Sequence, residues 1–376
     1  MNMRNLLFFI ITLAVVVTAW QASQNGAPTT EISTRLLYPS LSEGLNEVRR
    51  FSILTAKNNT QLERQGTQWV VANRDNFPAN FSAVKSTLLN LSTSRILEEK
   101  TSNPMNYSKI GVNRPDDDGS ESVLIEIHDA ANQTVASLII GKERSANKLD
   151  TPNYFARESE VATALLVQGD LKMSDDPIKW MDTSVVNVST ERVQSVTIER
   201  PNETVVNLSK AAQSDNFFEL AAIPDGFTAV SRATVSSVGA VLLGVRFQDV
   251  MTRDIVSELK PEVSAIVRTF DGLVATIDLF DVDEKKVSRF RFGFDQNLIA
   301  SAPAPSTEEP QENDQSDNEA DEKLSVEDEV EKLNAAVEKW VYVLPDYKTR
   351  LIDKRFDELV KPVEANEDNA PTEQPE

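Results

Sequence analysis

A serine and a lysine one helical turn apart are the residues of this chain that most resemble a reaction centre. Ser82 and Lys85 match the S-x-x-K pattern of penicillin-recognising enzymes, in which the lysine can activate the serine for acyl transfer. Ser214-Asp215-Asn216 and Ser316-Asp317-Asn318 match the second motif of those enzymes, whereas the third motif, Lys-Thr-Gly, is missing from the sequence. Because short patterns arise by chance, a serine hydrolase using Ser82 and Lys85 is the weakest of three functional alternatives.

Clustered carboxylates are the second candidate for chemistry, because oxygen ligands suit Ca²⁺ and Mg²⁺. Asp116, Asp117 and Asp118 precede Gly119, and Asp281 and Asp283 lie at an expected hairpin turn. Neither group has the alternating ligands and the terminal glutamate of an EF-hand loop. We therefore expect solvated turns, with no metal and no cofactor.

The single histidine, His128, lies on an expected strand with one apolar face. It shares the outward face with Glu126, while Val123, Ile125 and Ile127 point to the other side. A general base needs a nucleophile or an acid aimed at it, and the neighbouring sequence supplies neither. We predict a surface histidine without a catalytic role. The chain contains no cysteine, which excludes disulfides, thiolate chemistry and Cys/His zinc sites.

Three tryptophans, Trp69, Trp180 and Trp340, offer flat faces that could bind a sugar. Each lies in or beside an apolar run, which favours core packing. An extracytoplasmic glycan-binding protein that uses exposed Trp180 and Trp340 is the second functional alternative. Nucleotide binding has no support, because no glycine-rich phosphate loop follows an expected strand.

The negative charge of the chain is concentrated in two segments. The formal net charge is -21, and residues 308–331 and 364–376 contribute -11 and -5 of it. Such segments have too few apolar residues to offset chain entropy, so we predict a disordered insertion over 301–334 and a disordered tail over 362–376. Phosphate would repel a negative chain, so nucleic acid is not an expected partner.

The amino-terminal segment has the composition of a membrane helix. An unbroken apolar run covers Leu6 to Ala19, and its extension to Ala22 reaches the lower limit of about 17 residues for a spanning helix. We predict an anchor over residues 1–23, with a cleaved signal peptide as the alternative. Arg4 precedes the run, and no further basic residue follows until Arg35, so the amino end should be cytoplasmic.

This orientation predicts a single-pass protein of the bacterial inner membrane, with the body on the periplasmic or extracytoplasmic side. Residues 24–44 are polar at their start and contain a proline, so we predict a linker.

The first unit is predicted over residues 45–188. Short β-prone runs separated by turn residues come first, and the period then changes to that of a helix. Phe81, Val84, Leu88 and Leu91 fall on one face of this helix.

The second unit is predicted over residues 189–361 and repeats that order. Ser231 is placed to cap a helix whose inward residues are Val235, Val238 and Leu242. Strands, a helix, a hairpin and an aromatic strand follow one another in both units, which indicates an internal repeat.

The aromatic strand of each unit gives the expected correspondence between the two. Tyr154 in the first unit and Trp340 in the second should occupy comparable places, with the acidic segment as a loop before Trp340. The predicted fold class is α+β: antiparallel sheets with a few packed helices, in two tandem related units behind a transmembrane helix.

Several runs of the sequence resemble a known family. They are LLYPSLSEGLNEVRRFSI, FPANFSAVKSTLLNL, SNPMNYSKIGV, DPIKWMD and KWVYVLPDYKTRLI, within residues 36–361. They are similar to an uncharacterised bacterial family with a shared domain of unknown function behind an amino-terminal membrane anchor. Its members are often encoded beside gliding-motility-type ABC transporter components. The resemblance implies an accessory role, and it supplies no catalytic residues.

The leading hypothesis combines these features. We expect a membrane-anchored extracytoplasmic accessory or interaction protein of an envelope ABC transport system, without catalysis. Its expected partners are the membrane, through the amino-terminal helix, and an ABC transporter permease or a related envelope protein.

Overall fold

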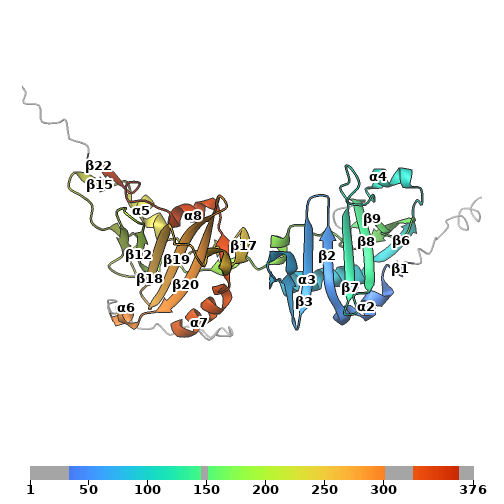
Figure 1. Ribbon diagram of the computed structural model, residues 1–376, viewed down its shortest axis with the longest axis horizontal. Helices are drawn as coiled ribbons and strands as arrows, with labels where there is room; N and C mark the ends of the chain where they lie inside the picture. The colour runs from blue at the N-terminus through green and yellow to red at the C-terminus, as the bar shows by residue number, and fades with distance from the viewer. Residues whose placement is uncertain (1–33, 145–150, 301–324, 364–376) are drawn as a thin grey trace, which may run out of the picture. The chain divides into compact units, whose positions relative to one another are not determined.

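The computed structural model of the chain describes residues 34–144, 151–300 and 325–363 (Figure 1). These residues form two units, the first made of 34–60 with 82–175 and the second of 61–81 with 176–363. The predicted anchor over 1–23, residues 301–324 and residues 364–376 lie outside the described ranges. Within those ranges, no helix is both long and apolar enough to cross a membrane.

The first unit is built on one antiparallel sheet, with strands in the order β1-β6-β10-β9-β8-β7-β2. Its strands are β1 (Arg35–Leu36), β2 (Val48–Leu54), β6 (Arg95–Glu99), β7 (Val123–Asp129), β8 (Thr134–Glu143), β9 (Asn153–Glu158) and β10 (Ala164–Gln168). Its helices are α2 (Pro39–Glu43), η1 (Leu45–Glu47), α3 (Phe81–Thr93), η3 (Pro104–Asn106) and α4 (Tyr107–Ile110).

Helix α3 follows the predicted apolar stripe. Val84, Leu88 and Leu91 are buried at helical spacing, as the sequence predicts. Phe81 was predicted on the same face, but its side chain is 58% exposed. It is the first residue of the helix and lies at the end of the apolar stripe.

The predicted linker over 24–44 ends earlier than expected. Strand β1 pairs with β6, and α2 begins at Pro39, where its fixed φ suits the first turn of a helix. Leu37, Tyr38 and Leu41 are buried in the first unit. Their apolar surface therefore holds this part of the chain on the sheet.

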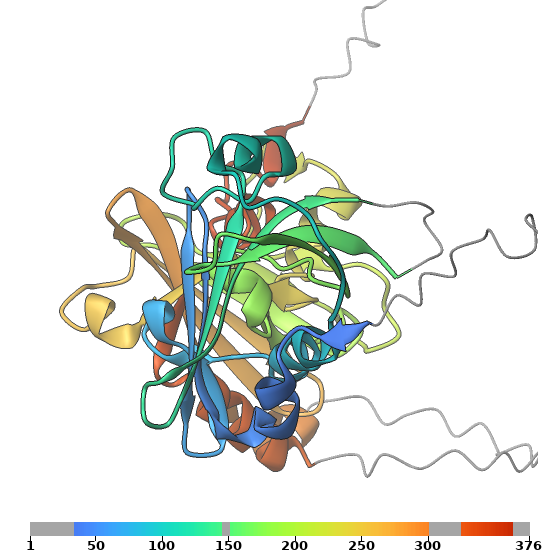
Figure 2. The ribbon, with the colours of Figure 1, turned by 90° about the vertical axis from the view of Figure 1, so that its right-hand side faces the viewer.

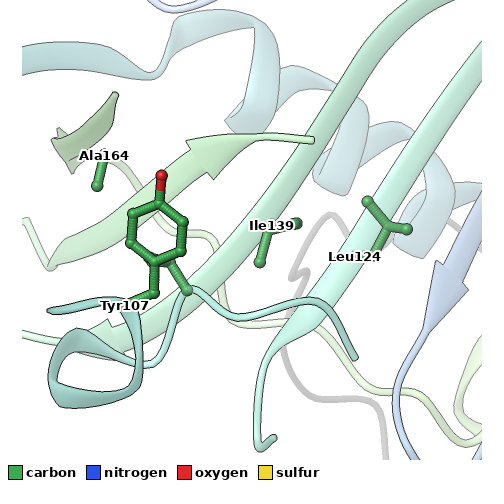
Figure 3. Close-up of a cluster of buried hydrophobic side chains, with 5 residues drawn as sticks. Tyr107, Leu124, Ile139 and Ala164 are labelled. Carbon is green, nitrogen blue, oxygen red and sulfur yellow. The ribbon is translucent and has the colours of Figure 1, made fainter. Parts of the chain in front are cut away.

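A small apolar cluster closes one end of the first unit (Figure 3). Tyr107, Leu124, Ile139 and Ala164 pack together there, although they come from α4, β7, β8 and β10. Figure 2 shows the short helical turn that contains α4 at the end of β7 and β8. The Tyr107 ring also lies 4.8 Å from the guanidinium carbon of Arg157.

The second unit contains an eight-stranded antiparallel sheet in the order β17-β21-β20-β19-β18-β12-β13-β14. Its strands are β12 (Val193–Glu199), β13 (Val206–Ser209), β14 (Glu219–Leu220), β17 (Asp249–Thr252), β18 (Val263–Thr269), β19 (Leu273–Val282), β20 (Lys285–Phe294) and β21 (Trp340–Val343). Two-stranded pairings join β11 (Ser184–Val186) to β16 (Val245–Arg246) and β15 (Phe227–Ala229) to β22 (Val360–Pro362). The helices are η4 (Pro177–Trp180), α5 (Arg232–Val238), η5 (Arg253–Val256), α6 (Gln296–Ala300), α7 (Val326–Val337) and α8 (Asp346–Ile352).

Helix α5 begins where the sequence predicts. The Ser231 hydroxyl accepts a hydrogen bond from the Thr234 amide at 3.0 Å, which satisfies an unpaired donor of the first turn. Val235 and Val238 are buried on its inner face. Leu242 is buried too, but it lies beyond the end of the helix at Val238.

Helix α7 corrects the prediction of disorder for residues 325–334, the last part of the predicted insertion. The Ser325 hydroxyl accepts from the Asp328 amide at 3.1 Å, and Glu327, Asp328 and Glu329 occupy the first turn. Negative side chains stabilise the amino end of a helix, because they complement the helix dipole. The last acidic residues of the segment therefore begin a helix that lies beside β20 (Figure 1).

Residues 61–81 contribute a second set of strands, η2 (Ala72–Arg74) and an aromatic anchor to the second unit. β3 (Asn59–Gln65), β4 (Gln68–Val71) and β5 (Phe77–Pro78) pair as an antiparallel meander. The Phe77 ring lies 4.9 Å from the Trp340 ring and 5.3 Å from the Phe247 ring. Apolar burial thus attaches a segment from early in the chain to residues that come about 170 and about 260 positions later.

The two units share a strand order. In the first, β6-β10-β9-β8-β7-β2 are neighbours, and in the second β17-β21-β20-β19-β18-β12 take the same order along the chain. The fold class, α+β with antiparallel sheets and few helices, is confirmed. The expected correspondence of Tyr154 with Trp340 is wrong by one strand, because Tyr154 lies on β9, which matches β20, and Trp340 lies on β21, which matches β10.

Candidate functional site

The predicted serine and lysine pair lies on the surface of the first unit. Ser82 and Lys85 are both exposed in the first turns of α3. Ser214-Asp215-Asn216 lies in the second unit, and Ser316-Asp317-Asn318 lies outside the described residues. Two of the three elements therefore belong to different units.

The acidic run Asp116–Asp118 forms an exposed turn. The Asp117 carboxylate accepts from the Arg114 amide at 3.0 Å, and Asp116 lies 3.3 Å from the Arg114 guanidinium. Gly119 takes a φ of +71°, which favours glycine. In the parts of the chain that the structure describes, no three acidic or histidine side chains are grouped as metal ligands.

The later acidic turn joins β19 to β20. Asp283 and Glu284 both have positive φ, as a two-residue hairpin turn requires. The carboxylate of Asp281 lies 3.3 Å from the ammonium of Lys286. These acidic residues therefore have a structural role in the hairpin.

His128 lies half-buried on β7, opposite Arg50 of β2. Its Nδ1 is buried and has no hydrogen-bond partner among the described residues. The ring is thus less exposed than the sequence pattern predicts.

The three tryptophans are buried. Trp69, Trp180 and Trp340 are 5%, 4% and 8% exposed, which agrees with core packing. A sugar stacks on an exposed ring face, and none of the three offers one. Trp180 and Trp340 therefore cannot form the platform that the glycan-binding alternative requires.

The structure instead contains a pocket in the second unit, and the Ser214-Asp215-Asn216 motif is part of its lining. It has a volume of about 600 Å³. Its walls are the loop that leaves β13, strand β14 and the first residues of α5. Pockets of small-molecule sites commonly have volumes of this order.

Lys210 lines the pocket and is 6% exposed. Its ammonium donates to the Thr190 carbonyl at 2.9 Å and lies 4.8 Å from the centre of the Phe218 ring. Burial lowers the pKa of the Lys210 ammonium, while Asp215 and Glu191 act to raise that pKa.

Phe218 is a buried residue of the pocket lining. Its ring is 3% exposed, and its amide donates to the Ser236 hydroxyl of α5 at 3.0 Å. A Cβ at Gly239 would lie 2.2 Å from this ring. A glycine at this position therefore lets α5 and the Phe218 ring approach closely.

The chain that follows Lys210 forms a tight turn. The Asp215 carboxylate accepts from the Ala212 amide at 2.8 Å, and the Asp215 amide donates to the Ala212 carbonyl at 3.1 Å. These bonds fix the loop on which Phe217 projects, and the Phe217 side chain is 49% exposed. Asp215 belongs to the Ser214-Asp215-Asn216 motif, so this motif lines a pocket of the second unit, whereas Ser82 belongs to the first unit.

One signal of this pocket was present in the sequence. Val206, Leu208 and Lys210 alternate along β13 and its end, and all three are buried. A lysine at an inward position of an alternating strand is unusual, because a buried charge needs compensation. The other lining residues follow no period, so sequence reasoning could not assemble them.

Comparison with known proteins gives one family. None of the curated proteins matches the chain. The model of a family described as a domain of unknown function, DUF4340, matches residues 69–262, which is more than half of the chain and includes the pocket. The chain therefore belongs to the DUF4340 family.

Proposed function

We propose that the protein is a membrane-anchored extracytoplasmic accessory protein that holds or senses a partner of an envelope ABC transport system. The observation that carries this proposal is the apolar run Leu6 to Ala22, which precedes a polar stretch and two strand-rich units. One tether and a large folded body are typical of proteins that present a binding surface at a membrane.

The transporter link rests on the resemblance of residues 36–361 to a family whose members are often encoded beside gliding-motility-type ABC transporter components. The orientation rests on Arg4, which precedes the apolar run and favours a cytoplasmic amino end. Buried Trp180 and Trp340 weaken the glycan-binding alternative. The accessory role is therefore the better-supported proposal, and it requires no catalysis.

Co-purification from a mild detergent tests the partner. The tagged full chain should retain a permease subunit of an ABC transporter, after crosslinking at low reagent concentration. A matched chain in which a cleavable signal peptide replaces residues 1–23 shows whether the body alone suffices. A clean preparation of the full chain without any membrane partner would refute the proposal.

Protease added to intact spheroplasts tests the orientation. The body should be digested while cytoplasmic markers stay intact. An Arg4→Glu variant should show a smaller accessible fraction, because a basic residue before the span helps to retain that end inside. Full protection of the wild-type body would contradict the proposed location.

A further inference from the structure

Lys210, in the lining of the pocket of the second unit, is a buried cation whose hydrogen-bond donors are only partly satisfied by the described residues. Lys210 has three ammonium protons, and the described residues supply one oxygen acceptor, the Thr190 carbonyl, and one ring face. In the described ranges no carboxylate forms an ion pair with Lys210, although Asp215 and Glu191 lie near enough to act on its charge. Buried charges are normally paired, so this ammonium can accept an anionic partner.

Arg232 supplies a second cation at the same pocket. It is exposed at the start of α5, and the structure gives it no ion-pair partner among the residues described. Its guanidinium can bind a planar anion through two parallel hydrogen bonds. Of the two acidic residues that line the pocket, Asp215 is engaged by the Ala212 amide, and Glu219 is exposed on β14.

The remaining lining is largely apolar. Phe217 presents a half-exposed ring, while Leu220, Ile223, Ala229 and Val235 continue the wall. An exposed phenylalanine at a cavity is suited to contact the flat or alkyl part of a ligand.

The geometry points to this pocket as a binding site for a small organic anion whose body is aromatic or alkyl. Lys210 and Arg232 bind the carboxylate, sulfonate or phosphate group, and Phe217 covers the apolar body. The inference goes beyond the proposed accessory role and does not depend on it. A pocket that binds such an anion would serve equally a protein with no transporter partner.

Calorimetric titration of the full chain in a non-ionic detergent tests this site, with naphthalene-1-sulfonate as the probe and neutral naphthalene-1-sulfonamide as its matched analogue. The sulfonate should bind, and the sulfonamide should bind at least tenfold more weakly. Arg232→Gln should weaken sulfonate binding about tenfold, since a charge-assisted pair is lost. Because Arg232 is exposed, this variant should keep its fold.

Three further variants test which residues bind the probe. Lys210→Met should weaken sulfonate binding at least as much as Arg232→Gln, and Phe217→Ser should weaken both probes. Lys260→Gln changes an exposed lysine that does not line the pocket and should bind like the wild type. Equal affinity of wild type and Arg232→Gln for the sulfonate, or equal affinity of wild type for both probes, would overturn the proposal.

Discussion

At the residue scale, the most buried carboxylate of the second unit is Asp278. It is 1% exposed and accepts from Arg289 at 2.8 Å, from Arg291 at 3.0 Å and from Ser264 at 2.7 Å. The Arg289 guanidinium also lies over the Phe280 ring. One carboxylate thus holds two arginines of β20 in place on the sheet.

We predict that Asp278→Asn lowers the free energy of unfolding by about 3 kcal/mol, because it leaves charged, partly buried arginines without their anion. Urea unfolding measures this loss. Asp283→Asn in the exposed hairpin turn is the control and should change stability by less than about 0.5 kcal/mol. Equal effects of the two substitutions would show that Asp278 is structurally unimportant.

Lys210 should make the free energy of unfolding depend on pH in the alkaline range. Burial lowers its pKa in the folded state, so the unfolded chain binds this proton more readily. The free energy of unfolding should therefore rise as pH increases from the folded-state pKa towards the ordinary lysine value. Asp215 and Glu191 are the acids that oppose this shift.

The comparison of wild type with Lys210→Met isolates this contribution. The methionine variant loses the bond to the Thr190 carbonyl at every pH, so the informative quantity is the slope of stability against pH. We expect the wild-type slope to exceed that of Lys210→Met, while Lys260→Met keeps the wild-type slope. Identical slopes for wild type and Lys210→Met would contradict a lowered pKa.

At the element scale, α7 covers part of the β20 edge that β21 does not reach. β21 pairs with β20 only at Val287 and Ser288. Further along, the Asn334 side chain accepts from the Phe292 amide at 3.0 Å and donates to the Phe292 carbonyl at 2.8 Å. An uncovered edge strand invites pairing with another chain, and one amide side chain on α7 satisfies both backbone groups here.

Asn334→Asp should keep the hydrogen bond from the Phe292 amide and remove the one to the Phe292 carbonyl. Aspartate can accept from the Phe292 amide but cannot donate to the Phe292 carbonyl. We expect a loss of about 1 to 3 kcal/mol and faster hydrogen exchange of the Phe292 amide. Glu331→Ala, at an exposed position of the same helix, should leave this exchange rate unchanged.

Sequence patterns predicted the elements better than their pairing. Val84, Leu88 and Leu91, and the Ser231 cap, depend on neighbours within a few residues, which the sequence displays directly. The correspondence of Tyr154 with Trp340 is wrong, because the sequence does not show which strands are neighbours in each sheet, and the two residues lie one strand apart in the shared order. Helix α7 was missed because its acidic first turn has the composition of a disordered segment.

The candidate site was less predictable than the fold. Its walls come from β13, β14 and α5, and only tertiary packing brings these together. The residue patterns that the sequence highlights, Ser82 with Lys85 and the Asp116–Asp118 run, lie on exposed surfaces. Lys210 was the one informative residue, since its inward position conflicts with its charge.

At the scale of the whole molecule, residues 61–81 are part of the second unit although the first unit surrounds them in the sequence. Arg74 lies 3.1 Å from the Asp249 carboxylate, and the Thr252 amide donates to Asp75 at 3.2 Å. The Asn80 amide donates to the Trp180 carbonyl at 2.7 Å. Polar bonds thus fix the segment on both sides of Phe77.

We predict that Phe77→Ala lowers the stability of the second unit by about 3 to 5 kcal/mol, because it leaves a cavity against Phe247 and Trp340. Hydrogen exchange should accelerate in β17 and β21 and stay unchanged in β7 and β8. Phe81→Ala removes a ring that is 58% exposed and serves as the control. Uniform acceleration in both units would refute a local role for Phe77.

The position of Phe77 in the chain also determines when its contacts can form during synthesis. Its partner Trp340 leaves the ribosome about 260 residues later, which takes roughly 13 to 50 s at ordinary elongation rates. During that interval the Phe77 side chain cannot yet pack against Trp340. The nascent polypeptide is therefore most in need of chaperone protection before its final strands emerge.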